Sequence, residues 1–309
     1  MSKHDRPILT RRDFVRGTAG TVLAASVLGP SRLLSARTEE PSAEVAQAEV
    51  APTTPQRSRV VVVREQAVQG DDAVVDQAVL GTMLATALTR VTGAPTAAEA
   101  WASLYESTDV VGLVKSNFMA HTHDELMQLV LASLMSLGIP EANLLDAQGD
   151  NAAVEKSTAM MCIPALKAHW LTGIGTVLKN YIMYSGKPSA YHKADSEKLA
   201  EIWQMDHVAG KTRLTLVDAL RPMCNKGPQP DPRYKWNYNG LVAGTDPVAV
   251  EAVCVKILEA KREAIKGEPW PLTPTPVCLE AADKTYGLGT ADLANIDLEM
   301  VGWEDEALI

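Results

Sequence analysis

The sequence contains no closely spaced pair of cysteines. Its four cysteines, Cys162, Cys224, Cys254 and Cys278, show no C-x-x-C spacing. Iron–sulfur clusters and structural zinc sites usually draw on closely spaced ligands, so the chain has no iron–sulfur cluster motif and its cofactor stays unknown. Disulfides would be permitted in an exported protein, but the spacing assigns no pairs. Cys254 falls on the apolar face of an expected helix, which favours a place in the core.

Signature motifs of several enzyme classes are also missing. The sequence has no G-x-x-x-x-G-K-[ST] loop, no G-x-S-x-G elbow, no H-E-x-x-H pair and no strict G-x-G-x-x-G after a strand. Nucleotide-binding, hydrolase and zincin functions therefore lack support. An excess of basic residues is missing too, since the net charge is -9. That charge argues against a general partnership with nucleic acid or an anionic membrane, although it permits a local basic pocket.

The first 36 residues have the pattern of a targeting signal. Arg11 and Arg12 precede an apolar run from Gly17 to Leu28. A twin arginine before a modest apolar run is typical of a Tat-type signal peptide, here residues 1–36. The run is shorter than the ~20 residues of a spanning helix; the alternative is a basic arm or an amphipathic helix. We therefore expect the Tat translocase to deliver the protein to the periplasm or the cell exterior, with membrane contact only through this segment.

The rest of the chain divides into a linker and one folded domain. Residues 37–57 are rich in Ala, Glu, Pro, Thr and Gln, which predicts a disordered linker. Buried strands are expected at 59–64, 110–115, 143–146, 158–163, 213–217, 240–244 and 295–301. Helices are expected at 71–91, 96–105, 122–137, 195–206, 246–258 and 275–287. This alternation predicts a single α/β domain over residues 58–309, with a mostly parallel or mixed sheet flanked by helices.

The stretch from Cys162 to His192 places cationic and amide side chains in an apolar, glycine-bearing sequence. Its polar members include Lys167, His169, Lys179, Asn180 and His192. Buried charge is costly without a partner, and an anion is the simplest partner for this set of donors. Lys167 and His169 stand two apart, so they would share one face of an extended segment. The sequence predicts an anion-binding site here; the alternative is a surface segment with solvated lysines.

Several polar residues fall at or just after the ends of expected strands. They are Lys115, Asn117, Asp146, Lys167 and Asp218. In open α/β sheets, ligands bind beyond the carboxyl ends of the strands, which groups these residues into one candidate site. Asp218 would end a buried strand beside a proline-rich loop, and its alternative role is that of a turn former.

Two other candidate groups have local explanations at helix starts. Asp246 precedes a proline, which is a common helix start, so a site role for Asp246 stays open beside that of an N-cap. His121 and His123 could be two metal ligands, but their spacing is weak without two more. Thr122 and Glu125 instead predict a capping box for the following helix.

Several segments of the chain resemble a known family. They are VGLVKSNF, IPALKAHWLTGIGTVLKN, the later His192, LTLVDALRPMCNKGP and NGLVAGTDPVAVEAV. Together, over residues 59–257, they are similar to the family called domain of unknown function 362. The resemblance implies an α/β protein of mostly unassigned activity, whose relatives often carry ferredoxin-like modules, and it allows an iron–sulfur redox partner. The motif positions of the family fall here on Lys115, Asn117, Lys167, His169, Lys179, Asn180, His192, Asp218 and Asp246. Ala219 and Glu251 depart from the usual Gly and Asp.

These patterns predict an exported protein, an enzyme or a redox-associated protein, that binds an anionic small molecule. The ligand-binding residues would be Lys115, Asn117, Lys167, His169, Lys179, Asn180 and Asp246. His192 or Asp218 would act as general acid or base, since histidine titrates near neutrality. Two alternatives stay open: a non-catalytic binding module, and a metal site built from His169, His192 and Asp218.

Overall fold

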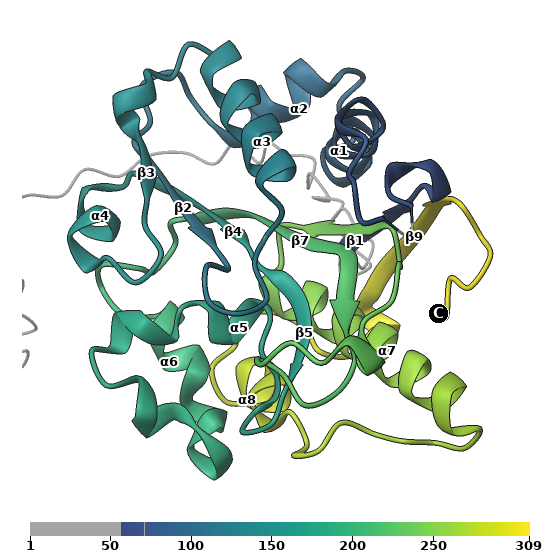
Figure 1. The fold of residues 1–309 in the computed structure, drawn as a ribbon. Coiled ribbons are helices and arrows are strands. Elements are labelled where there is room, and N and C mark those ends of the chain that lie inside the picture. Colours follow the sequence, from purple (N-terminus) through teal and green to yellow (C-terminus); the bar gives the residue numbers. More distant parts are fainter. Residues whose placement is uncertain (1–56, 71) are drawn as a thin grey trace, which may run out of the picture. The chain divides into compact units, whose positions relative to one another are not determined.

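The computed structural model describes residues 57–70 and 72–309 (Figure 1). The expected signal, residues 1–36, and all of the expected linker except Arg57 lie outside the described residues. None of the helices in the described part combines the length and the apolar character that a membrane crossing needs.

A single mixed sheet organises the described residues. Its main path has the order β3-β2-β4-β7-β8-β1-β9, with β5 paired to β7 and β6 paired to β5. The strands are β1 Ser58–Arg64, β2 Val111–Lys115, β3 Leu144–Asp146, β4 Ala159–Ile163, β5 Ala165–His169, β6 Gly173–Ile174, β7 Thr212–Met223, β8 Gly240–Gly244 and β9 Ile296–Gly302. The pairs β1–β8, β7–β8 and β5–β6 are antiparallel and the other pairs are parallel. The predicted α/β fold with a mixed, mostly parallel sheet is confirmed.

Helices cover both faces of this sheet (Figure 1). They are α1 Gln77–Thr92, α2 Ala97–Leu104, α3 Asp124–Ser136, α4 Asn151–Lys156, α5 Val177–Asn180, α6 Leu199–Trp203, α7 Pro247–Lys266 and α8 Val277–Lys284. Apolar residues of α1, α2 and α3 belong to one buried cluster, and those of α5, α6, α7 and α8 belong to another. The sheet therefore separates two apolar cores.

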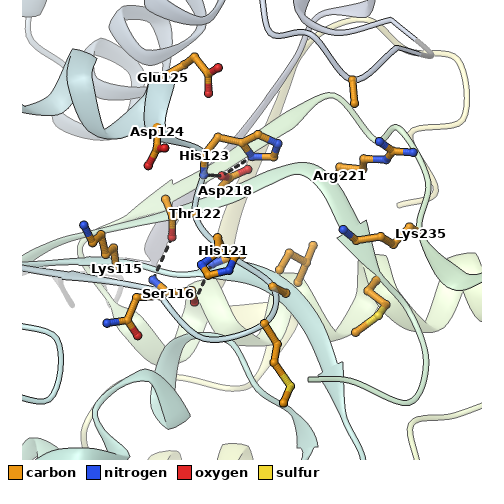
Figure 2. Close-up of a pocket in the computed structure, with 17 residues that line it drawn as sticks. Lys115, Ser116, His121, Thr122, His123, Asp124, Glu125, Asp218, Arg221 and Lys235 are labelled. Atoms are coloured by element: carbon orange, nitrogen blue, oxygen red, sulfur yellow. Dashed lines mark hydrogen bonds and ion pairs between the residues drawn. The ribbon is translucent and has the colours of Figure 1, made fainter. Parts of the chain in front are cut away.

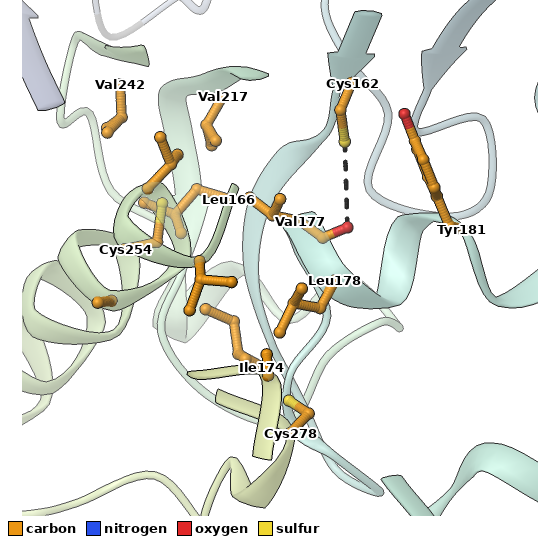
Figure 3. Close-up of a cluster of buried hydrophobic side chains, with 14 of the residues drawn as sticks. Cys162, Leu166, Ile174, Val177, Leu178, Tyr181, Val217, Val242, Cys254 and Cys278 are labelled. Carbon is orange, nitrogen blue, oxygen red and sulfur yellow. Dashed lines mark hydrogen bonds between the residues drawn. The ribbon is translucent and has the colours of Figure 1, made fainter. Parts of the chain in front are cut away.

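Strand β1 shows why a run of valines suits this position. Val60 and Val62 lie in the core of the α7 side, whereas Val61 and Val63 lie in the core of the α1 side. Successive side chains of a strand point to opposite faces, so a strand covered on both faces needs apolar residues throughout. Figure 3 shows part of the core on the α7 side, where Cys254 of α7 approaches the sheet.

Strand β7 is longer than the sequence predicted. The expected strand, 213–217, runs on to Met223, so the prediction that Asp218 ends a strand is wrong. The first half of β7 pairs with β4 as far as Thr215, and the second half pairs with β5 from Asp218 onward. Strands β4 and β5 therefore lie one after the other along the same edge of β7, and β7 extends past the end of β4. Lys167 likewise lies within β5 and not at a strand end.

Helix α3 begins differently from the prediction. It starts at Asp124, and its N-cap residue His123 makes no side-chain capping hydrogen bond. The hydroxyl of Thr122 accepts from the backbone N–H of Ser116 (3.0 Å) and donates to the carbonyl of Ile163 (2.6 Å). Since these bonds occupy the hydroxyl, the predicted capping box is wrong, and Thr122 instead ties the β2–α3 loop to β4.

Candidate functional site

Two cavities lie next to each other where β2 and β5 give way to loops. The lysine pocket has a volume of about 570 Å³ and is lined by Asn117, Lys167, His169, Lys179, Asn180 and His192, among others. The His–Asp pocket has a volume of about 610 Å³ and is lined by Lys115, Asn117, His123, Asp218, Arg221 and Lys235, among others. Both cavities include Ser116 and Asn117. The structure thus divides most of the predicted site residues between two neighbouring cavities, whereas Asp146 and Asp246 line neither of them.

Lys167 is the most deeply buried lysine that lines the lysine pocket. Its side chain is buried, and Nζ donates to Oγ of Ser116 (2.9 Å) and to the carbonyl of Ala165 (3.2 Å). Lys167 and His169 line the same cavity from β5, as their spacing predicted. Burial, and after it the charge of Lys179, together lower the pKa of Lys167 to about 8.

Lys179 adds a second cation to the same cavity. Burial alone lowers its pKa to about 8. In residues 57–309, neither Lys167 nor Lys179 forms an ion pair with a carboxylate. The cavity therefore holds two ammonium groups whose charge is poorly compensated, and this arrangement favours an anionic ligand.

His169 and His192 stack on each other in this cavity, with ring centroids 5.8 Å apart. Nδ1 of His169 accepts from the backbone N–H of Leu171 (3.2 Å), so the ring proton stands on Nε2. Burial lowers the pKa of His169 to about 3, assisted by the charges of Lys179, His192 and Lys167. Burial and Lys179 also lower the pKa of His192. Both imidazoles are therefore neutral near pH 7 and supply hydrogen bonds without adding charge.

The completely buried Glu251 holds the start of the short helix α5. Its carboxylate accepts from the backbone N–H groups of Val177 (2.7 Å) and Leu178 (3.3 Å). Asn180, at the other end of α5, donates to the carbonyl of Val114 (2.7 Å). These bonds hold α5 to the sheet and fix the backbone from which Lys179 projects, so the amide of Asn180 has a structural role.

The His–Asp pocket contains a pair that the sequence did not reveal. Nδ1 of His123 lies 2.7 Å from Oδ2 of Asp218, and the backbone N–H of His123 donates to the same oxygen, also at 2.7 Å (Figure 2). The backbone N–H of Leu220 donates to Oδ1 of Asp218 (3.1 Å). Burial would lower the pKa of His123, but the hydrogen bond and charge of Asp218 outweigh it and raise that pKa. The Asp218 carboxylate therefore orients an imidazole, as a histidine base requires.

The remaining predicted residues lie at the margins of these cavities or away from them. Lys115 forms an ion pair with Asp146 (3.3 Å) at the edge of the His–Asp pocket, and Asn117 is exposed between the two cavities. Asp218 faces His123 and not His169 or His192. Within the described ranges, no group of three or more His, Cys, Asp or Glu side chains is placed to hold a metal ion, so the metal alternative gains no support.

Asp246 lies outside both cavities. One carboxylate oxygen accepts from the backbone N–H groups of Val248 (2.9 Å) and Ala249 (3.0 Å) at the start of α7. The other accepts from the hydroxyl of Ser58 (2.6 Å) and the backbone N–H of Thr290 (3.0 Å). These four bonds account for the aspartate as a cap that joins α7 to β1 and to the loop before β9.

The four cysteines are buried free thiols. Cys254 lies in the core of the α7 side, as its helical position predicted, and Cys162 and Cys278 lie in the same core (Figure 3). Burial raises the pKa of Cys224 to about 11, and it also raises the pKa of each of the other three thiols. Thiols with raised pKa values are poor nucleophiles, so their role is packing.

Comparison with known proteins places these features in a family. Residues 86–256, more than half of the chain, match the family described as domain of unknown function (DUF362). No curated protein and no solved structure matches the chain. The matched range contains both pockets' polar residues from Lys115 to Lys235, together with Glu251 and Asp246. The chain therefore belongs to the DUF362 family.

Proposed function

We propose that the lysine pocket binds an organic acid, whose ionised group lies between Lys167 and Lys179. The observation that carries this proposal is the presence of a buried lysine, Lys167, and a half-buried lysine, Lys179, in one cavity, neither of which forms an ion pair with a carboxylate within residues 57–309. A bound anion would compensate both charges and raise both lysine pKa values. Affinity for the acid should therefore fall as the pH rises through about 8, where the free lysines lose their protons.

The mouth of the lysine pocket suggests that the acid has an apolar body. Phe118 and Met183 line the cavity and are 66% and 47% exposed, whereas Lys167 and His169 are each 6% exposed. Ile182 and Pro228 add apolar surface to the lining. The volume of about 570 Å³ lies in the range of sites for drug-sized ligands. Cations at depth and apolar side chains near the solvent suit an amphipathic acid better than a small inorganic anion.

Proton transfer by His192 is part of the proposed function. Its half-buried ring stacks on His169 in the cavity that holds the lysines, so a bound acid would lie within its reach. A lowered pKa keeps this imidazole in its basic form near pH 7. A binding module without catalysis is the second candidate, and the neutral, hydrogen-bonded state of His169 favours it, because a donor alone serves recognition.

A series of straight-chain carboxylates tests the proposed ligand class. In calorimetric titrations at pH 7, affinity should rise about fourfold for each methylene from acetate to hexanoate, because a buried methylene contributes about 0.8 kcal/mol. Phe118→Ser should flatten this dependence, while Val74→Ser, at an equally exposed position outside the cavity, should leave it unchanged. Equal affinity for acetate and hexanoate would refute the apolar body. Absence of binding throughout the series would refute the organic-acid site.

Export by the Tat route belongs to the same proposal and rests on the sequence alone. Changing both Arg11 and Arg12 to lysine should retain the protein in the cytoplasm, because the translocase reads the arginine pair and not basic charge in general. Fractionation of cells that express each form measures the result. An unchanged yield in the periplasm would contradict the Tat assignment.

A further inference from the structure

The His–Asp pocket contains two cations that the lysine pocket does not explain. In the described part of the chain, neither Arg221 nor Lys235 forms an ion pair, and Nε of Arg221 is buried without a hydrogen-bond partner. Burial lowers the pKa of Lys235, and the charge of Arg221 lowers it further, so the two groups repel each other. Two neighbouring cations with open donors in a cavity of about 610 Å³ call for an anion.

The acidic side chains that line this cavity do not pair with Arg221 or Lys235. The charge of Asp218 acts on Lys235, but both oxygens of Asp218 accept hydrogen bonds from His123 or Leu220. Asp124 and Glu125 lie on the α3 side of the cavity, across from Arg221 and Lys235 (Figure 2). Lys115, the third lysine or arginine of the lining, is paired with Asp146. The side of the cavity that carries Arg221 and Lys235 therefore remains open to an acid.

His123 faces this open side with one ring nitrogen fixed. An ionised Asp218 can only accept a hydrogen bond, so Nδ1 of His123 carries a proton and donates a hydrogen bond to the carboxylate. Nε2 is then the nitrogen that exchanges protons, and the ring points toward the side of Arg221 (Figure 2). The side chain of His123 is 26% exposed while that of Asp218 is 1% exposed, so a ligand would meet the imidazole first.

We infer that the His–Asp pocket is a second site for acids, in which Arg221 and Lys235 hold an oxyanion group and Nε2 of His123 exchanges a proton with the ligand. When the neutral imidazole takes the proton, the electron pair of the broken bond stays on the ligand, and the Asp218 carboxylate stabilises the imidazolium that forms. The reverse step returns the proton. The charged groups that face His123 in this exchange are Asp218, Glu125, Lys235 and Arg221. This site is distinct from the lysine pocket and adjoins it at Ser116 and Asn117.

The test uses inorganic phosphate as the probe and the imidazole protons as reporters. In NMR spectra of histidine-labelled protein, up to about 10 mM phosphate should shift the His123 signals and raise the pKa of His123, since a site of millimolar affinity fills in this range. Arg221→Met or Lys235→Met should weaken this response about tenfold, because each removes a charge-assisted hydrogen bond. Arg233→Met, which removes an exposed arginine of the same loop paired with Asp231, is the matched control and should leave the response unchanged.

The same spectra test the role of the Asp218 carboxylate through the pKa and the tautomer of His123. Asp218→Asn should lower the pKa of His123 and change its tautomer, since an amide can donate to Nδ1. If phosphate leaves the His123 signals unshifted, the inference is overturned. It is also overturned if the phosphate-induced shift is unchanged in Arg221→Met and in Lys235→Met. An Asp218→Asn variant in which the pKa of His123 stays at its wild-type value would overturn the proton-transfer role. The carboxylate series judges the lysine pocket separately, so each proposal fails on its own result.

Discussion

Replacing Lys167 by methionine should make the protein about 1 kcal/mol more stable at pH 7 and weaken hexanoate binding about 100-fold. Keeping this buried ammonium charged costs about 3 kcal/mol, from a pKa of about 8 against an ordinary 10.5. The variant also loses the hydrogen bonds to Ser116 and Ala165, which reduces the gain in stability by about 2 kcal/mol. Binding suffers because the ionised ligand loses a partner in a site shielded from water.

Denaturant unfolding and calorimetry on the same preparations measure both effects. Lys167 loses its proton at lower pH in the folded protein than in the unfolded chain, so the unfolded state binds more protons between pH 8 and 10.5. The stability of the wild type should therefore gain a contribution across that window which Lys167→Met lacks. Lys187→Met, at an exposed position of the same stretch outside the cavity, should change neither quantity. Loss of stability together with binding would instead mean that the cluster is structural.

Glu251→Gln should remove a large part of the pH dependence of stability between pH 4.5 and 7. Burial raises the pKa of Glu251 to about 7 from an ordinary 4.5, although the N–H groups of Val177 and Leu178 oppose the shift. In this window the folded protein holds a proton that the unfolded chain has released, so stability falls as the pH rises, by about 3 kcal/mol in total. Glutamine has no such proton to release.

Above pH 7 the Glu251→Gln variant should exceed the wild type by about 2 kcal/mol, after about 1 kcal/mol is subtracted for weaker hydrogen bonds to α5. Urea unfolding midpoints at several pH values from 5 to 8 would show the difference in slope. Glu263→Gln, an exposed position on the same helix, should behave like the wild type. Parallel slopes for wild type and Glu251→Gln would show that the buried carboxylate is already ionised at pH 5.

The sequence contained enough to predict the fold and half of the site. Four consecutive valines predicted strand β1, and an aspartate–proline start followed by an apolar stripe predicted helix α7. The spacing of Lys167 and His169 indicated one shared cavity because side-chain direction in a strand alternates locally. Each of these features depends on neighbours in the sequence, which is why composition and periodicity were sufficient.

The second pocket depended on contacts that no local pattern records. His123 and Asp218 are 95 residues apart, and their hydrogen bond exists only because β7 continues past β4 to pair with β5. The length of β7 is a property of the assembled sheet, so the sequence pattern ended the strand before Asp218, six residues early. Similarly, Glu251 reaches the start of α5 across 74 residues, a contact that explains its burial and that helical periodicity alone could not supply.

The most direct measurement is the titration of Lys167 and Lys179 by NMR of their side-chain carbons, with and without hexanoate. In the free protein, both ammonium groups should titrate near pH 8, because both are desolvated by burial and neither forms an ion pair with a carboxylate among residues 57–309. Saturation with hexanoate should move both pKa values upward toward the ordinary value of about 10.4. Lysines that already titrate at the ordinary value in the free protein, or that remain near 8 when hexanoate is saturating, would contradict the proposed acid-binding site.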